Sequence, residues 1–409
     1  MARSTDPGSA GDGVACLNRS EPLTALQSPV VKPGGLLAIL GGGQLGRMTA
    51  MAARTMGYRV RVMDPEAACP ASFVADETII GAWDDVDAAR RLATDADVVT
   101  LEIEQIGVDA LNAVAAIATL RPGVEPIRII QDKTLQKTWL AENGFPVGAF
   151  RVVRNEAELH EAVRALGGRV FLKTGRGGYD GRGQARIGLD APATEEAIAA
   201  AWKSIGEQPA VAEQALALEC EISVMAARNP SGEVCSFPAA RNQHENQILA
   251  WSVLPAEVPS DLELHAEGLA EAIISKLHLE GLLCVELFVT SNDELVVNEL
   301  APRPHNSYHQ SERACVTSQF EQAVRAACNL PLGDTSLITP AAIVNLLGDV
   351  WLDRSGEPNF FSALTVPGVR LHLYEKHTPR PGRKMGHLSA VGPTADEALQ
   401  RVLEAKRRL

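Results

Sequence analysis

Short apolar runs alternate with alanine-rich segments between residues 35 and 130. Strands are expected where such runs lie between turn residues, at 36–40, 58–63, 97–102 and 127–130. The segment 48–54, between the first two runs, contains good helix formers. Because this alternation is typical of a parallel sheet with helices on both faces, we expect a Rossmann-like α/β domain over residues 35–131.

The pattern changes at Asp132, which has the position of a helix N-cap, and the helix should end near Gly144. Ser318 and Glu321 form a capping box for a second helix that should end at about Cys328. Between these helices, strands are expected at 169–174, in a segment that leads to 211–214, and in a hairpin over 282–300. This mixture predicts an α+β domain over 132–330.

The last part of the chain, 331–409, contains strand patterns at 341–347 and 369–374 among many Gly and Pro residues. An amphipathic helix is expected at 394–407. These elements predict a small carboxy-terminal domain that is rich in strands.

The composition of the 409 residues, with 46% hydrophobic and 22% charged residues, is that of a globular protein with two or three domains. We expect no membrane association, because the chain contains no apolar run of about 18 residues. The net charge of -13 argues against a nucleic-acid partner. The seven cysteines show no C-x-x-C spacing, so we expect reduced thiols and a cytoplasmic protein. Residues 1–34, rich in Ser, Gly, Pro and Ala, are expected to form a disordered extension.

The motif GGGQLGRM at 41–48 matches the dinucleotide-binding pattern G-x-G-x-x-G at Gly41, Gly43 and Gly46. Asp64 follows the second expected strand, where an acid binds the ribose in such folds. Taken alone, this stretch favours a nicotinamide-dependent oxidoreductase. That hypothesis leaves the features after residue 130 unexplained.

The expected hairpin at 282–300 carries one glutamate in each strand, Glu286 and Glu299. A four-residue loop at 291–294 would pair residue 290 with 295 and therefore Glu286 with Glu299. Two carboxylates in that position repel each other unless a divalent cation lies between them, and Mg²⁺ prefers such oxygen ligands. The alternatives are a carboxyl with a raised pKa, a side chain that points to solvent, or a different register.

Two other segments have the composition of phosphate sites. The loop 174–183 holds five glycines and follows Lys173, so its amides and the lysine could surround phosphate oxygens; the alternative is a mobile linker. The segment 376–387 gathers four cations and could hold a phosphomonoester; the alternative is a solvated loop. A zinc site at His305 and His309 is not expected, because nearby prolines oppose a helix there.

Together these features resemble the ATP-grasp superfamily and, within it, the 5-(carboxyamino)imidazole ribonucleotide synthase family. Eight motifs between residues 36 and 395 carry the resemblance, in this order: GGGQLGRM, QDKTLQKTWL, FLKTGRGGYDGRGQ, EISVMAAR, VELFV, VNELAPRPHNSYH, ACVTSQFEQ and RPGRKMGH. The resemblance implies ATP- and bicarbonate-dependent carboxylation of aminoimidazole ribonucleotide in purine biosynthesis, through carboxyphosphate. It also implies an ATP-grasp fold for 132–330, with a small lid lobe at about 150–210, and a homodimer.

The resemblance further implies a set of site residues. Those for ATP and its Mg²⁺ or Mn²⁺ ion are Lys133 and Lys173 at the phosphates, Glu213, Ala215 and Leu216 at adenine, Glu221 at ribose, and Glu286 and Glu299 at the metal. Those around bicarbonate, the transferred phosphoryl group and the amine are Arg303, His305, Asn306, Ser307 and Asp180. Those for the ribonucleotide are Gln44, Leu45, Glu104, Tyr179, Asp180, Arg182, Lys376 and Arg383. In this family the turn at 43–46 would help to hold the 5'-phosphate.

Two alternatives to this function stay open at this point. Another ATP-grasp ligase, such as formate-dependent glycinamide ribonucleotide transformylase, would use a different acid and acceptor. A nucleotide-binding regulator without catalytic activity would bind ATP and release no ADP.

Overall fold

The computed structural model describes residues 29–178, 183–353 and 357–409. Most of the expected extension at 1–34 therefore lies outside the described residues, as do Tyr179, Asp180 and Arg182. Within the described residues, no helix combines the length and the apolar composition that crossing a membrane requires.

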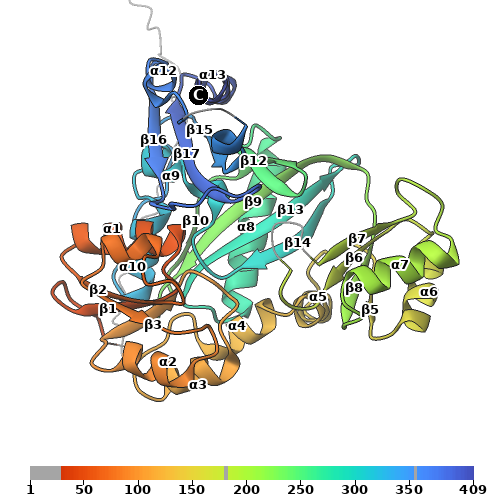
Figure 1. The fold of residues 1–409 in the computed structure, drawn as a ribbon, viewed down its shortest axis with the longest axis horizontal. Coiled ribbons are helices and arrows are strands. Elements are labelled where there is room, and N and C mark those ends of the chain that lie inside the picture. The colour runs from red at the N-terminus through yellow and green to blue at the C-terminus, as the bar shows by residue number, and fades with distance from the viewer. Residues whose placement is uncertain (1–28, 179–182, 354–356) are drawn as a thin grey trace, which may run out of the picture.

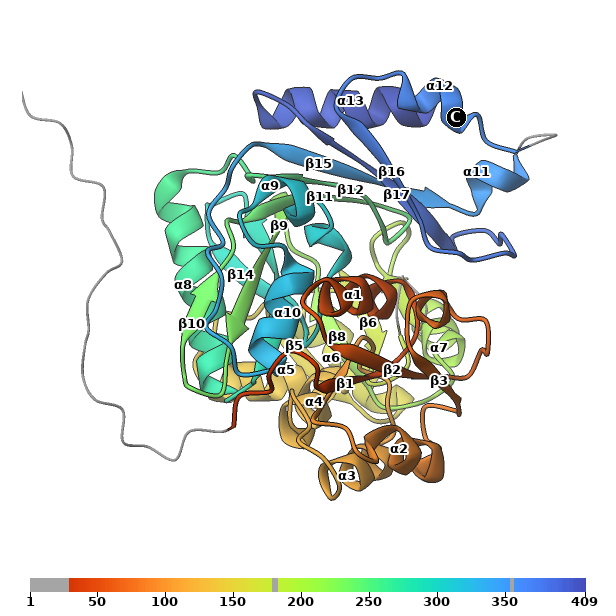
Figure 2. The ribbon, with the colours of Figure 1, turned by 90° about the vertical axis from the view of Figure 1, so that its left-hand side faces the viewer.

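The amino-terminal part is a parallel four-stranded sheet in the order β3-β2-β1-β4 (Figure 1). Its strands are β1 (Leu36–Leu40), β2 (Arg59–Asp64), β3 (Glu77–Ile80) and β4 (Val98–Leu101). One face packs against α2 (Val86–Ala93) and α3 (Val108–Ala115). The other face packs against α1 (Gln44–Thr55) and against α10 (Gln319–Ala327), which arrives from much later in the chain (Figure 2). The prediction of a parallel sheet covered on both faces is confirmed.

The strand expected at 127–130 is wrong, because these residues belong to α4 (Val124–Ile130). Ile127 and Ile130 are buried and lie three residues apart, which is helical spacing, while Arg128 pairs with Glu125 on the exposed side. A short apolar run does not distinguish the two structures. The sheet takes its fourth strand from β3 instead, an edge strand with exposed ends.

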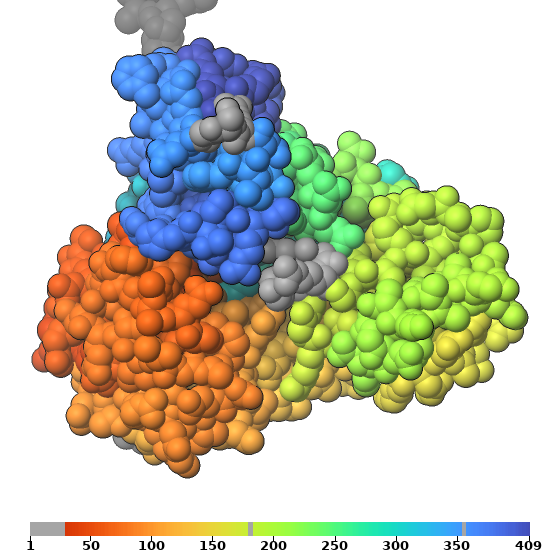
Figure 3. Space-filling model, viewed as in Figure 1, coloured from red at the N-terminus to blue at the C-terminus, as the bar shows by residue number. Residues whose placement is uncertain are grey.

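Helix α5 (Lys133–Glu142) follows, and its N-cap Asp132 accepts hydrogen bonds from the N–H groups of Thr134 and Leu135, as expected. The chain then forms a small lobe that lies apart from the amino-terminal sheet (Figures 1 and 3). Its sheet has the order β5-β8-β6-β7. The elements of this lobe are β5 (Phe150–Val153), α6 (Glu156–Ala165), β6 (Val170–Thr174), β7 (Gln184–Ile187), α7 (Glu195–Ser204) and β8 (Ala210–Gln214).

A nine-stranded sheet forms the centre of the molecule, in the order β14-β13-β9-β11-β12-β15-β17-β16, with β10 beside β9. Its strands are β9 (Leu218–Arg228), β10 (Val234–Ser236), β11 (Ala240–Glu245), β12 (Ile248–Leu254), β13 (Gly281–Thr290), β14 (Leu295–Ala301), β15 (Ala341–Leu347), β16 (Val369–Leu373) and β17 (Lys384–Val391). The helices around it include α8 (Ser260–Lys276), α9 (Ser311–Ala314), α11 (Asp349–Leu352), α12 (Phe360–Leu364) and α13 (Ala395–Arg407). The carboxy-terminal strands continue this sheet, because β15 pairs with β12.

The hairpin β13–β14 has the expected cross-strand pair but not the expected loop. Val289, rather than Thr290, pairs with Leu295, which by itself would shift the register by one residue. A bulge beside Glu286 shifts it back, so that Glu286 pairs with Glu299. The expected loop is one residue too short and the expected strands lack the bulge. These two differences cancel, so the predicted pair of Glu286 and Glu299 is observed.

Candidate active site

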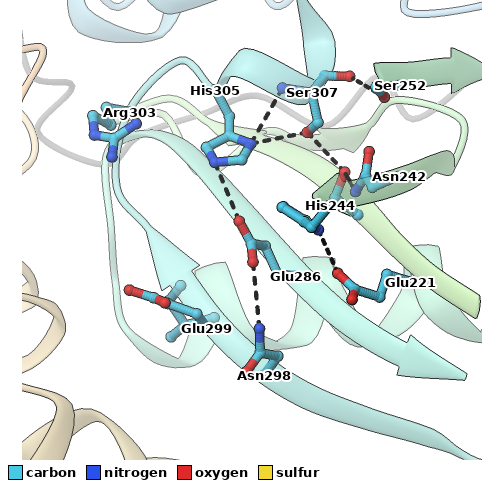
Figure 4. Close-up of polar contacts among 12 residues, drawn as sticks. Glu221, Asn242, His244, Ser252, Glu286, Asn298, Glu299, Arg303, His305 and Ser307 are labelled. Atoms are coloured by element: carbon cyan, nitrogen blue, oxygen red, sulfur yellow. Dashed lines mark hydrogen bonds and ion pairs between the residues drawn. The ribbon is translucent and has the colours of Figure 1, made fainter. Parts of the chain in front are cut away.

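The paired glutamates lie at the centre of the site (Figure 4), and each has a cationic partner. The imidazole Nε2 of His305 lies 3.2 Å from Glu286 Oε1, and the ammonium of Lys133 contacts Glu299. Asn298, the extra residue of the bulge, donates from Nδ2 to Glu286 Oε2 at 3.4 Å. Burial alone would raise the pKa of Glu286, but the bond from His305, together with the charges of His305, His244 and Lys133, outweighs burial and holds the pKa at about 2. The alternative of a glutamate with a raised pKa is therefore not supported at Glu286.

His305 is fixed by a chain of polar groups behind it. Its Nδ1 lies 2.9 Å from Ser307 Oγ, which lies 2.8 Å from Ser223 Oγ. Asn242 donates to Ser223 Oγ at 3.0 Å. Burial lowers the pKa of His305, but Cys284 and Glu286 outweigh burial and raise the pKa to about 10. The imidazole is thus held in place beside Glu286, and its raised pKa favours the protonated form.

Asn306, another expected site residue, lies between His305 and Ser307 in the sequence and is 6% exposed. Among the described residues, neither its Oδ1 nor its Nδ2 has a hydrogen-bond partner. An unpaired buried amide costs about 1–3 kcal/mol. Its position fits a residue that completes its bonds with a ligand.

Lys173 approaches the pair from β6, in the small lobe. Its ammonium lies 2.7 Å from Glu213 Oε2 and donates to Asn298 Oδ1 at 3.1 Å. The second oxygen of Glu213 lies 3.1 Å from the ammonium of Lys137, a residue that the sequence analysis did not identify. Burial would raise the pKa of Glu213, but the two lysines hold it at about 2. The side chain of Glu213 is therefore an ion-pair partner as well as part of the expected adenine segment.

The ribose candidate Glu221 pairs with His244, whose Nδ1 lies 2.6 Å from Glu221 Oε2. Burial opposes a charge on His244, but the bond to Glu221 and the charges of Glu286 and Glu221 together outweigh burial and raise its pKa. Both residues border a hollow of about 460 Å³ with Trp251 and Asn242. His244 lies in β11 and carried no motif by itself, so only the structure identifies it.

The expected adenine residues Ala215 and Leu216 follow β8. The N–H of Ala215 donates to the carbonyl of Arg169 at 2.9 Å. This N–H is therefore already used within the protein, and a contact from Ala215 to adenine would use its carbonyl.

Arg303 joins the central domain to the amino-terminal domain through Glu104. Its Nε and one terminal nitrogen donate to the two carboxylate oxygens at 2.5 and 3.1 Å. Burial would raise the pKa of Glu104, but the guanidinium outweighs it and lowers the pKa. The structure thus brings together two residues that are 199 positions apart and that were both expected at the site.

The amides of the glycine turn are occupied by two carboxylates of the protein itself. Gly43 and Gly46 donate to Glu102 at 2.7 and 3.0 Å, and Gly42 donates to Asp64 at 2.9 Å. In a dinucleotide fold, a pyrophosphate takes such amides. Because Glu102 holds this position, the oxidoreductase hypothesis loses its structural basis, and the amides of Gly43 and Gly46 are not free for a 5'-phosphate either.

The basic segment lies against this turn rather than in solvent. Lys376 donates to Gln44 Oε1 at 2.6 Å, and Arg383 lies 3.8 Å from Glu66. Gln44 is thus beside one of the expected cations, Lys376, while Leu45 is buried in an apolar cluster with Phe320 and others. Gln44 and Lys376 thus lie together at a contact between the first and last parts of the chain, whereas Glu104 pairs with Arg303 of the central domain.

His309 is not part of a zinc site with His305. Its ring stacks on Phe320 and on His387, with centroids 5.7 and 4.7 Å apart. Glu312, His372 and His387 bring possible ligand atoms within 4.8 Å of one another. Of these atoms, His372 Nδ1 and Glu312 Oε2 lie 3.8 Å apart.

Three domain families match successive parts of the chain. Residues 36–131 match the ribonucleotide synthetase preATP-grasp domain, and residues 138–320 match the ATP-grasp domain. Residues 341–401 match the phosphoribosylaminoimidazole carboxylase C-terminal domain. The order of these matches agrees with the expected ATP-grasp architecture.

Similar proteins and structures carry one activity in their names. The N5-carboxyaminoimidazole ribonucleotide synthase of Bacillus subtilis is 40% identical over 377 residues, covering 92% of this chain and 97% of the relative. The ADP complex of an N5-carboxyaminoimidazole ribonucleotide synthetase has a TM-score of 0.86 and 38% identity, covering 92% of this chain and 98% of the other. The Aspergillus clavatus N5-carboxyaminoimidazole synthase, in complex with ADP and 5-aminoimidazole ribonucleotide, has a TM-score of 0.83 and 29% identity, covering 92% and 100%.

Proposed function

The chain belongs to the N5-carboxyaminoimidazole ribonucleotide synthase family of ATP-grasp ligases, and on this premise we propose how its site carboxylates 5-aminoimidazole ribonucleotide. The enzyme is an ADP-forming ligase of purine biosynthesis that uses ATP and bicarbonate. The observation that carries the assignment of the site is the pair Glu286 and Glu299, with Lys133, Lys173 and Arg303 around it.

The residues at the pair fit a Mg²⁺ ion. Glu286 and Glu299 offer hard carboxylate oxygens from directly opposite positions, and Mg²⁺ commonly uses one or two carboxylates together with substrate phosphates. Glu286 and Glu299 would hold the ion, which would neutralise charge on the ATP phosphates. The same donors would accept Mn²⁺.

The chain's own side chains would hold ATP for phosphoryl transfer. Lys133 and Lys173 would bind the phosphates, and Glu221 with His244 would bind the ribose. Bicarbonate is a poor electrophile, so transfer of the terminal phosphoryl group to a bicarbonate oxygen would give carboxyphosphate, whose carbonyl is activated. Such transfer depends on positioning and charge neutralisation rather than on a nucleophilic side chain.

Arg303 and the residues after it would hold bicarbonate and carboxyphosphate. The guanidinium of Arg303, oriented by its two bonds to Glu104, presents a fixed cation for bicarbonate and carboxyphosphate. Asn306 would complete its bonds with these ligands, beside His305 and Ser307. Charge would thus be stabilised where it develops on the transferred group.

Aminoimidazole ribonucleotide would bind at the contact between the first and last parts of the chain. Lys376 and Arg383 would hold the ribonucleotide phosphate, together with Gln44, which accepts a hydrogen bond from Lys376. Among the residues outside the described ranges, Tyr179 and Arg182 would address the ribonucleotide, and Asp180 would orient or deprotonate the amine. The amine would then attack carboxyphosphate or CO₂ released from it.

Two further proposals concern the protein as a whole. We propose a homodimer, supported by the family resemblance, and a cytoplasmic location. The location is supported by the six cysteines among the described residues, all of which are free thiols.

The test is ADP release by the purified protein with Mg·ATP, with bicarbonate and aminoimidazole ribonucleotide supplied together, singly or not at all. Release that needs both supports the proposal. Release with formate and glycinamide ribonucleotide instead would assign the transformylase activity. Full ATP binding without ADP release would indicate a regulator.

A further inference from the structure

Lys137 is a buried lysine to which the proposed function gives no role. It lies one helical turn after Lys133 on α5, yet the two side chains have different partners. Lys133 contacts Glu299, while Lys137 lies 3.1 Å from Glu213 and donates to the carbonyl of Val297 at 3.1 Å. Lys137 is 5% exposed, so its ammonium is largely shielded from solvent.

Glu213 is shared by two lysines, one on each carboxylate oxygen. Oε1 lies 3.1 Å from Lys137, and Oε2 lies 2.7 Å from Lys173. Lys173 has a second contact, Asn298 Oδ1, next to the metal candidate Glu299. The second contact of Lys137 is the backbone of β14, at the carbonyl of Val297. The two ion pairs are therefore not equivalent, because only Lys173 has a contact on the side of the expected phosphates.

Electrostatics explain why one carboxylate has two cations. Removing one partner from a buried ion pair costs several kcal/mol, because the remaining charge is left desolvated and uncompensated. If Glu213 had only Lys173, moving that lysine to a phosphate would leave the carboxylate alone. With Lys137 in place, Glu213 keeps a partner after Lys173 moves.

We propose that Lys137 is a positioning residue for nucleotide binding: it keeps Glu213 paired, so that Lys173 is able to leave Glu213 and bind the ATP phosphates. The inference rests on the proposed function for the role of Lys173. The class of ligand that it concerns is a nucleoside polyphosphate, and a nucleoside without phosphates should not depend on Lys137.

A double-mutant cycle with Lys137→Met and Glu213→Gln tests the proposal. Calorimetry would measure the Kd of Mg·ATP and of adenosine for the wild type, both single variants and the double variant. In Lys137→Met, Glu213 holds Lys173, so Mg·ATP should bind at least about tenfold more weakly while adenosine binding changes less than about threefold. Adding Glu213→Gln removes the carboxylate that retains Lys173, so the double variant should bind Mg·ATP more tightly than Lys137→Met does.

A purely structural role for Lys137 predicts a different pattern of dissociation constants. Loss of packing would weaken ATP and adenosine binding together, and the second substitution would not restore either. That result, or unchanged Mg·ATP binding in Lys137→Met, would overturn the proposal. Lys203→Met, at an exposed lysine of α7, is the matched control and should bind both ligands as the wild type does.

If Lys137→Met does not fold, Glu213→Gln alone still tests the proposal. The proposal expects the Kd of Mg·ATP to rise no more than the Kd of adenosine in this variant, because Lys173 is released; a loss of about tenfold for Mg·ATP alone would contradict it. Lys173→Met checks the premise, since unchanged Mg·ATP binding there would also overturn the inference. These readouts need no turnover, so a wild type that binds Mg·ATP but does not carboxylate the ribonucleotide would refute the proposed function and leave the inference standing.

Discussion

Glu286 on β13 lies directly opposite Glu299 on β14, and each carboxylate contacts a different cation, His305 or Lys133. Two like charges in a cross-strand pair destabilise a sheet unless other charges compensate them. The hairpin therefore keeps a costly arrangement that a divalent cation bound with ATP phosphates would use.

Glu299→Gln should lower turnover by at least about 100-fold, because one carboxylate ligand becomes a neutral amide while the shape is kept. The variant should remain folded, as circular dichroism would show. Glu294→Gln, at the exposed turn of the same hairpin, is the control and should retain normal turnover. Full activity of Glu299→Gln would remove the metal assignment.

Arg303→Lys should lower kcat/KM by about 100-fold, because a lysine cannot make the two parallel bonds to Glu104 and loses the fixed planar cation. Steady-state kinetics with bicarbonate as the varied substrate would measure it. Arg186→Lys changes an arginine of an exposed ion pair on β7 and should have little effect. Equal kinetics for the two variants would contradict a role for Arg303 in holding the acid.

Lys376→Met should raise KM for aminoimidazole ribonucleotide by about tenfold and leave KM for ATP nearly unchanged, because it removes a charge at the expected phosphate position. Arg380→Met, at an exposed position in the same basic segment, is the comparison. A similar rise in KM for both substrates would show that Lys376 acts on the fold rather than on the ribonucleotide.

Glu267→Gln should stabilise the protein near pH 8 and have no effect near pH 4. Burial and the flanking Glu263 and Glu271 raise the pKa of Glu267 to about 7 from an ordinary value of 4.5. Below pH 4.5 the carboxyl is protonated in both the folded and the unfolded protein. As the pH rises through 7, the carboxyl ionises more readily in the unfolded protein, so the wild type loses stability over this range.

The expected gain for Glu267→Gln near pH 8 is on the order of 1–2 kcal/mol, because Glu267 is partly exposed and solvent screens part of the effect. Urea unfolding at both pH values would measure it. Glu161→Gln, at an exposed position of α6, should change stability little at either pH. An equal gain at both pH values would assign the effect to something other than ionisation.

Local signals in the sequence predicted most elements correctly. The N-caps Asp132 and Ser318 begin helices as expected, because a capping side chain and the backbone N–H groups that donate to it lie within three residues. The helix at 124–130 was missed because the buried residues Ile127 and Ile130 suit either structure over so short a run. The pairing of Glu286 with Glu299 was predicted correctly only because a bulge compensates for the longer loop.

Contacts between distant segments could not be predicted from local pattern. Glu102 occupies the amides of the glycine turn from 56 or more positions away, and nothing in GGGQLGRM indicates this partner. Lys137 and His244 also become site residues only when β8 and β9 bring Glu213 and Glu221 to them. The family resemblance supplied the expected site residues, and the structure supplied the side-chain partners that fix them.

The most direct test of the central claim is an isotope measurement with ¹⁸O-labelled bicarbonate in a reaction with Mg·ATP and aminoimidazole ribonucleotide. If the site phosphorylates bicarbonate, the P–O bond formed to the acid remains when the carbonyl carbon is released, so inorganic phosphate should gain one ¹⁸O atom per turnover. Mass spectrometry of the phosphate would measure this. Phosphate without ¹⁸O, formed while the ribonucleotide is carboxylated, would contradict activation of bicarbonate by ATP at the site around Glu286 and Glu299.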